Sequence, residues 1–522
     1  MSIAIVSEQL FIQEGSLARQ LRAAEAAWKR QDFQRSFEIL ENASRSVPND
    51  PCVLLDLGSA HGLRYDYAEA ERWFEKAIRV SGWKTASFVA AGIHCLRFNQ
   101  YEMARRYFER ALKKNGDSTE ALVHLAGIYE RQHQLDAAAG MVDRALHLNG
   151  HCTSALLAQA KLHRMAGRLE EAERVLRSFV TKPDPDTRTH IHAWYELGRV
   201  LDGQGRYDDA MAAFLEGKTL VQPNAAALVA VQQAAQARTK KMAETISPGV
   251  LQRWVEASDT TSKPLIRLTV LGGHPRSGTT LLEQVLDAHP EIVSAEETTI
   301  FHDDVYLPLV RGVPLETVSL TQILDSASPQ LLQPLRANYL NLTERFLGET
   351  IGSRSLIEKN PALTVFIPAV VRVFPEAKFL VALRDPRDVC LSCFMQPLAL
   401  TPVSSSFLSL DGTVTEYASV MGFWRTLKPQ MRNLALEVRY EDLVDDLELV
   451  ARRALEFLGI AWDARVLGFH EHARNKVVRS PTYAEVAKPV FKGAVGRWRN
   501  YRKHLEPWMG KLEPFVKAFG YE

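Results

Sequence analysis

The sequence is poor in cysteine and in long apolar runs. It contains five cysteines in 522 residues. Because this number is small and odd, we expect no disulfide framework. No stretch of about 18 consecutive apolar residues occurs, and the first residues lack the basic segment and apolar run of a secretory signal. We therefore expect no membrane partner and a cytoplasmic location.

An excess of charge of either sign is also lacking. The 63 Lys and Arg residues balance 62 Asp and Glu residues, for a formal net charge of +1, so nucleic acid is not favoured as a partner. No acidic cluster resembles a magnesium site, and His470 and His472 have no obvious third ligand, so we expect no metal. Composition and length predict a globular protein of more than one domain.

The first 220 residues repeat with a period of 34. A small residue recurs at Ala24, Gly58, Gly92, Ala126 and Ala160. Sixteen positions after each stands a larger apolar residue, namely Leu40, Phe74, Phe108, Val142 and Leu176. A sixth copy with Gly198 and Phe214 follows a short insertion. The pattern predicts helix pairs in which the small residue permits close approach and the larger one fills the groove.

Residues 17–222 therefore resemble the tetratricopeptide repeat family. The resemblance implies an α-solenoid, whose concave surface usually binds a protein or peptide; a scaffold that positions the rest of the chain is an equal alternative. Residues 223–263 predict a capping helix and a linker, with a hinge at Ser258 to Lys263. Residues 264–522 form the predicted second domain.

The second domain opens with a strand, a glycine-rich loop and a helix. The apolar run Leu265 to Leu271 precedes the loop, and such a loop at a helix start binds anions through its amide groups. Gly273 and Gly278 have the spacing of an ATP-binding P-loop, but Thr279 replaces its lysine. The sequence therefore predicts a phosphate or sulfate site, and its expected contacts are Arg276, Ser277, Gly278, Thr279 and Thr280.

The run PRSGTTLLEQVLDAHPEIVSAEET, which starts at Pro275, resembles the sulfotransferase family, most closely its tyrosylprotein sulfotransferase branch. Further motifs follow in the family's order. They are Ile357 to Pro361, Lys378 to Asp388, Val438 to Leu443 and the basic segment Lys488 to Tyr501. The resemblance implies a P-loop-like α/β domain with a central parallel sheet. It also implies 3'-phosphoadenosine-5'-phosphosulfate (PAPS) as the sulfuryl donor.

The resemblance assigns roles to residues that match these motifs. Glu297 is the implied catalytic base, and Arg276, Lys359 and Ser480 stabilise the sulfuryl group in transfer. Arg384 and Ser392 hold the donor's 3'-phosphate. Tyr440, Lys492 and Arg497 are the remaining implied donor contacts. Phe491 stands where cytosolic members have an arginine, which shifts the phosphate contacts to Lys492 and Arg497.

The sequence thus predicts an enzyme that transfers a sulfuryl group from PAPS to an acceptor hydroxyl, foremost a tyrosine in a protein. A carbohydrate, lipid or small phenolic acceptor remains open, as does the oligomeric state. Two other readings are a non-catalytic repeat scaffold and a nucleotide kinase, which the missing lysine disfavours. Cys390 and Cys393 are expected as small residues on a buried helix, and Leu398 to Thr413 as a surface loop.

Overall fold

The computed structural model describes residues 15–182, 186–257, 266–313, 318–431, 433–475 and 492–521, together with Val486, Lys488 and Val490. The predicted hinge at Ser258 to Lys263 and the candidate Ser480 lie outside these residues. The chain divides into two compact units, residues 1–175 and 176–522. Among the described residues, no helix combines the length and apolarity needed to cross a bilayer.

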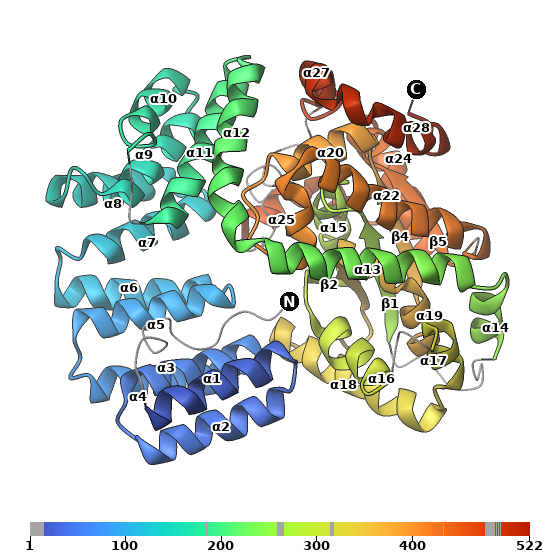
Figure 1. The fold of residues 1–522 in the computed structure, drawn as a ribbon, viewed down its shortest axis with the longest axis horizontal. Coiled ribbons are helices and arrows are strands. Elements are labelled where there is room, and N and C mark those ends of the chain that lie inside the picture. Colours follow the sequence, from blue (N-terminus) through green and yellow to red (C-terminus); the bar gives the residue numbers. More distant parts are fainter. Residues whose placement is uncertain are drawn as a thin grey trace. The chain divides into compact units, whose positions relative to one another are not determined.

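The described part of the chain begins with ten helices in successive hairpins (Figure 1). They are α1 (Ser16–Lys29), α2 (Phe33–Ser46), α3 (Pro51–Leu63), α4 (Tyr67–Val80), α5 (Thr85–Arg97), α6 (Tyr101–Lys114), α7 (Thr119–Arg131), α8 (Leu135–Leu148), α9 (Thr153–Met165) and α10 (Leu169–Arg177). Local signals set several starts: at α3 the Asp50 carboxylate accepts hydrogen bonds from the Cys52 and Val53 amides.

The side chains at the repeat positions match in size across each hairpin. A Cβ added to Gly58, Gly92 or Gly198 would lie 2.5–2.6 Å from the ring of the phenylalanine sixteen positions later. Where that later residue is Leu or Val, the small residue is Ala, as in the pair Ala126 and Val142. Glycine is therefore required where a phenylalanine fills the groove, because interiors are close-packed.

The second unit starts with another hairpin, α11 (Thr187–Gly203) and α12 (Tyr207–Val221), followed by α13 (Ala226–Thr245) and α14 (Val250–Glu256). Its strands are β1 (Arg267–Gly273), β2 (Ile292–Glu296), β3 (Ser355–Lys359), β4 (Lys378–Leu383) and β5 (Ala435–Arg439). The remaining described α-helices are α15 (Thr279–Asp287), α16 (Leu307–Val310), α17 (Leu320–Ser326), α18 (Pro329–Leu347), α19 (Ile367–Val373), α20 (Pro386–Phe394), α21 (Pro402–Ser405), α22 (Leu410–Leu427), α23 (Tyr440–Asp445), α24 (Leu447–Leu458), α25 (Phe469–Asn475), α27 (Arg502–Leu505) and α28 (Met509–Ala518).

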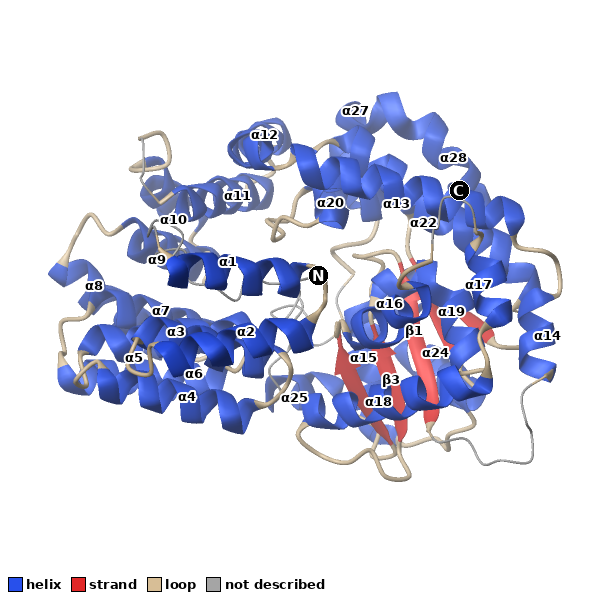
Figure 2. Ribbon diagram, turned by 60° about the horizontal axis from the view of Figure 1, so that its bottom comes forward, coloured by secondary structure: helices blue, strands red, loops and turns tan. Residues whose placement is uncertain are grey.

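The five strands form one parallel sheet in the order β2-β3-β1-β4-β5. Helices cover both faces, as Figure 2 shows around the red strands. On one face, side chains of α15, α24 and α25 share a core with the strands. On the other, Tyr339 of α18 and Trp424 of α22 hydrogen-bond to Glu358 of β3 and Glu437 of β5. The predicted helical repeats and α/β domain with a central parallel sheet are confirmed.

The segment Leu398 to Thr413 is not the surface loop that its serine and threonine content predicts. It contains α21 and the start of α22, and Ser404, Ser405 and Thr413 are buried. Their hydroxyls donate to nearby backbone carbonyls, which lets polar residues lie inside the domain. Cys390 and Cys393 lie buried on α20, as expected.

Candidate active site

Each described strand has a candidate residue at its carboxyl end or directly after it. Glu297 comes directly after β2, and Lys359 is the last residue of β3. The glycine-rich loop follows β1, Arg384 follows β4, and Tyr440 follows β5. Since the strands are parallel, these ends share one edge of the sheet. β2 and β3 lie on one side of β1, and β4 and β5 lie on the other. The strand order therefore reverses at β1, and open α/β sheets bind ligands at such a point.

The loop between β1 and α15 has the shape of an anion cradle. Arg276 has a φ of 72°, and Gly278, which precedes α15, has a φ of 91°. Thr279 and Thr280 are buried at the first positions of α15. The helix N-terminus and its positive dipole end therefore face the loop, which suits a phosphate or sulfate group.

Arg276, Ser392 and Arg384 lie together beside this loop. Arg276 donates through Nε to Ser392 Oγ at 3.0 Å, and Arg384 donates to the Arg276 carbonyl at 3.3 Å. The Arg384 guanidinium stacks over the Tyr440 ring at 4.9 Å, while its Nε is buried with no hydrogen-bond partner among the described residues. A buried arginine donor of this kind beside the loop suits a bound anion.

The fully buried Lys359 pairs with Glu297, whose side chain is 43% exposed. Lys359 is fully buried, and its Nζ lies 2.8 Å from Glu297, 3.3 Å from Glu296 and 3.5 Å from Glu283. Burial alone would lower the pKa of Lys359, but the three carboxylates outweigh it and raise the pKa above the usual value. The lysine therefore stays charged and fixes the Glu297 side chain.

Glu297 also has a constrained backbone. Its φ is 51°, and its amide donates to the Lys359 carbonyl at 2.7 Å. Among the described non-glycine residues of the second unit, Arg276 and Glu297 are the two with φ in the left-handed region. That conformation costs roughly 1–2 kcal/mol for such residues. Strain of this kind concentrates at functional sites, where the surroundings enforce it.

The buried carboxyl of Glu358 supports this edge from the opposite face of β3. Glu358 accepts hydrogen bonds from Tyr339 and Thr298, both at 2.9 Å, and burial raises its pKa to about 7 against the effect of those bonds. Asn360 donates to the Thr298 carbonyl at 2.8 Å. These contacts anchor the residue next to Glu297.

The C-terminal segment, residues 492–501, contacts the helix that follows β4. Asp388 accepts hydrogen bonds from the Gly496 and Trp498 amides, both at 2.7 Å. Arg384 donates to the Ala494 carbonyl at 2.6 Å, which joins this segment to the loop of Arg276. Asp388 therefore orders a segment more than 100 residues later in the chain.

The other two candidates of this segment have acidic partners. The exposed Lys492 pairs with Asp445 of α23. Arg497 pairs with Asp202 of α11 at 2.5 Å. Neither forms a described hydrogen bond to Arg276, Ser392 or Arg384, whereas Arg276 contacts both Ser392 and Arg384.

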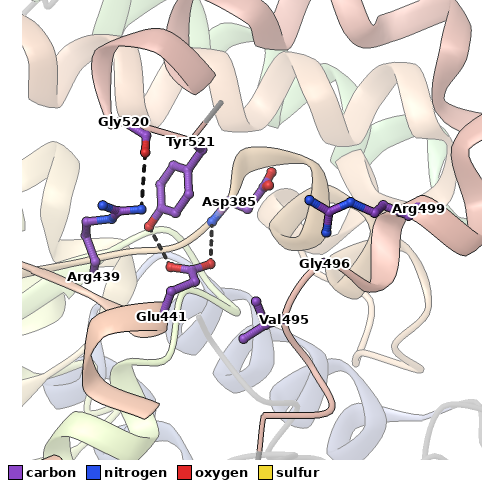
Figure 3. Close-up of a pocket in the computed structure, with 8 residues that line it drawn as sticks. All are labelled: Asp385, Arg439, Glu441, Val495, Gly496, Arg499, Gly520 and Tyr521. Atoms are coloured by element: carbon purple, nitrogen blue, oxygen red, sulfur yellow. Dashed lines mark hydrogen bonds between the residues drawn. The ribbon is translucent and has the colours of Figure 1, made fainter. Parts of the chain in front are cut away.

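A polar pocket lies beside this segment, between the ends of β4 and β5 (Figure 3). Residues that line this pocket hydrogen-bond to one another. The Glu441 carboxylate accepts hydrogen bonds from the Asp385 amide at 3.1 Å and from the Tyr521 hydroxyl at 2.7 Å. Arg439 donates to the Gly520 carbonyl at 3.2 Å. The pocket thus ties the last described residues to the strand ends.

Residues 269–464 match the profile of the sulfotransferase family. They form a sulfotransferase-family domain. Ahead of this sulfotransferase domain, residues 53–81 and 96–162 match tetratricopeptide repeat profiles, as do residues 190–225. The two families suggested by the sequence motifs are therefore confirmed.

Relatives of the sulfotransferase domain include protein-tyrosine sulfotransferase 1 of Danio rerio, 27% identical over 49% of this chain and 72% of that protein. Protein-tyrosine sulfotransferase of Drosophila melanogaster is 27% identical over 49% of this chain and 52% of that protein. An uncharacterized protein of Aquifex aeolicus is 24% identical over 67% of this chain. The match spans 44% of that protein's own length.

Among solved structures, the sulfotransferase domain of the Synechococcus PCC 7002 olefin synthase matches with a TM-score of 0.33 and 21% identity. The match covers 46% of this chain and 90% of that domain.

Motif reading of the sulfotransferase domain missed several residues that shape the site. Glu283 and Glu296 complete the charge around Lys359, and Thr364 accepts a hydrogen bond from the Gly273 amide at 2.7 Å. Glu296 could have been suspected from its place beside Glu297. Glu283 and Thr364 carry no local signal, since their roles depend on packing against distant segments.

Proposed function

We propose that this protein is a sulfotransferase that uses PAPS, with a tyrosine in a protein or peptide as its foremost acceptor. One observation carries the proposal: Arg276 and Glu297, two strained residues, lie at the same edge of the sheet, each held by a further candidate residue. Ser392 binds Arg276 and Lys359 binds Glu297. This arrangement supports an anion site and a base at one edge of the sheet.

In the proposed reaction, Glu297 accepts the proton of the acceptor hydroxyl as the oxygen attacks sulfur. Arg276 and Lys359 offset the charge on the sulfuryl group and on the departing phosphate. Ser480 is a proposed further contact outside the described residues. Sulfuryl transfer, like phosphoryl transfer, depends on in-line positioning and charge stabilisation. PAPS supplies the sulfuryl group, and no step proposed here uses a metal.

The donor's two ends have separate proposed sites. Ser277, Gly278, Thr279 and Thr280 surround the 5' phosphosulfate, at the start of α15. Arg384 and Ser392 hold the 3'-phosphate in this proposal, which is supported by the buried Arg384 Nε, since no acceptor in the described part of the chain binds it. Tyr440, Lys492 and Arg497 complete the proposed donor contacts.

The acceptor proposal rests on the relatives and on the helical repeats. Relatives named protein-tyrosine sulfotransferase favour a tyrosine, and tetratricopeptide repeats commonly bind proteins or peptides. A carbohydrate or small-molecule acceptor is the alternative within the same chemistry. The cytoplasmic location expected from the sequence stays a prediction.

Transfer from labelled PAPS to a tyrosine peptide tests the reaction. Glu297→Gln should lower kcat by about 10²- to 10⁴-fold, the usual contribution of a positioned base, and leave binding of 3'-phosphoadenosine-5'-phosphate (PAP) intact. Glu291→Gln is the matched control, since Glu291 is exposed and precedes the opposite end of β2.

Comparable turnover by Glu297→Gln and wild type would rule out Glu297 as the base. Turnover of sugars or small phenols but not of the tyrosine peptide would contradict the tyrosine acceptor and would still support sulfuryl transfer from PAPS. Thermal stabilisation by ATP with magnesium, with none by millimolar PAP, would point to a kinase instead.

A further inference from the structure

Asp202 lies on α11, in the sixth copy of the helical repeat, and contacts the C-terminal segment. Its Oδ2 lies 2.5 Å from Nη2 of Arg497, and its Oδ1 accepts a hydrogen bond from the Tyr501 hydroxyl at 2.7 Å. The Tyr501 ring is fully buried and packs edge-on against Tyr207 of α12, with centroids 5.3 Å apart. One carboxylate of the repeat therefore holds two side chains of this segment.

The same segment is held on its other side by the sulfotransferase domain. Asp388 binds the Gly496 and Trp498 amides, and the Ala494 carbonyl accepts a hydrogen bond from Arg384. The Trp498 indole donates to Asp385 at 3.1 Å, and Arg387 stacks over that ring at 4.0 Å. The segment thus bridges the repeat hairpin and the arginine proposed to bind the 3'-phosphate.

We propose that Asp202 is a positioning residue of the donor site, so that the last helical repeat forms part of that site. Asp202 fixes Arg497, and with it the backbone whose Ala494 carbonyl orients Arg384. This inference rests on the proposed use of PAPS. It assigns the α11–α12 hairpin a role besides that of a protein-binding repeat.

A neighbouring contact of the same hairpin shows why Asp202 stands out. Asp208 of α12 pairs with Lys503 and His504, but the Asp208 and Lys503 side chains are 60% and 64% exposed. Exposed pairs of this kind contribute little, because water screens them. The Asp202 side chain is 17% exposed and binds both an arginine and a buried tyrosine. Its loss should therefore move the segment, whereas loss of Asp208 should not.

Titration calorimetry of the full-length chain with PAP tests this role. Asp202→Asn keeps the shape and removes the charge, and it should weaken PAP binding roughly tenfold, as expected for losing a charge-assisted hydrogen bond. The KM for PAPS should rise by a similar factor while kcat stays within about twofold. Asp208→Asn should match wild type, and Asp202→Glu, which retains the charge, should recover most of the affinity.

A second arm repeats the titration in an Arg497→Met background. If Asp202 acts through Arg497, Asp202→Asn should cause little further loss there, since the partner is already gone. Unchanged PAP affinity in Asp202→Asn, or a full additional loss in the Arg497→Met background, would overturn the inference. If wild type binds no PAP, both the proposed function and this inference are refuted. If wild type binds PAP and Asp202→Asn binds it with the same affinity, this inference alone is refuted.

Discussion

Gly278 is a position where a single methyl group should matter. Its φ of 91° disfavours any other residue, and an added Cβ would lie 2.6 Å from Cδ2 of Tyr440. The ring has little room to retreat, because Arg384 stacks on it at 4.9 Å. The glycine therefore sets both the loop shape and the distance between two proposed donor contacts.

Gly278→Ala should lower the free energy of unfolding by roughly 1–3 kcal/mol and weaken PAP binding, because the loop must shift away from Tyr440. Urea unfolding and PAP titration measure the two effects. Gly127→Ala is the control: Gly127 lies exposed inside α7, and an added Cβ would meet no described atom outside this helix within 4 Å. The free energy of unfolding of Gly127→Ala should rise by about 0.5–1 kcal/mol, because alanine favours helix more than glycine does. PAP binding by Gly278→Ala equal to that of wild type would contradict this account of the loop.

At the scale of the elements, the helix hairpins depend on matched side-chain sizes. Phe108 of α6 fills the space over Gly92 of α5, and an added Cβ would lie 2.6 Å from its ring. In the next hairpins the small residue is alanine and the larger one is Val142 or Leu176. The sequence thus fills the same space between paired helices in two ways, by glycine with phenylalanine or by alanine with valine or leucine.

Gly92→Ala should destabilise the protein by about 1–3 kcal/mol through overpacking, even though alanine favours helix. The double variant Gly92→Ala with Phe108→Leu copies the arrangement of Ala160 and Leu176, so it should recover roughly 1 kcal/mol relative to the sum of the single changes. Thermal or urea unfolding of all four proteins measures this coupling. Strictly additive effects would show that the matched sizes have no energetic meaning.

At the scale of the whole molecule, buried charges make stability depend on pH. Lys218 of α12 is 2% exposed and donates to the Phe407 carbonyl at 2.5 Å, with the Phe394 ring 4.1 Å away. Burial lowers its pKa to about 7. The unfolded chain therefore binds more protons than the folded chain between pH 7 and about pH 10, so this residue makes stability rise with pH across that window.

Lys218→Met removes this effect. From pH 7 to pH 9 the free energy of unfolding of wild type should rise relative to the variant, by at most about 1.4 kcal/mol per pH unit. Urea unfolding at several pH values measures the difference. Lys240→Met on α13 is the control, because Lys240 is exposed and the variant should follow the wild-type curve. Parallel curves for wild type and Lys218→Met would show that the buried amine does not titrate in this range.

The sequence by itself determined the order of the parts. The 34-residue period predicted the helical repeats, because each hairpin needs the same contacts in the same places. The motifs around Arg276, Lys359, Arg384 and Tyr440 each join a strand to its following segment, so their common edge follows once the sheet is parallel. The families were recognisable for the same reason, since local motifs survive where overall identity is low.

Only the tertiary structure decided which charges meet. Register places Glu296 beside Lys359 on adjacent strands, and α15 brings Glu283 to the same amine. Asp202 and Arg497 meet because the last repeat packs against the C-terminal segment of the same compact unit. Nothing in the local sequence marks these partners, because an ion pair between distant segments depends on how the chain folds back rather than on spacing.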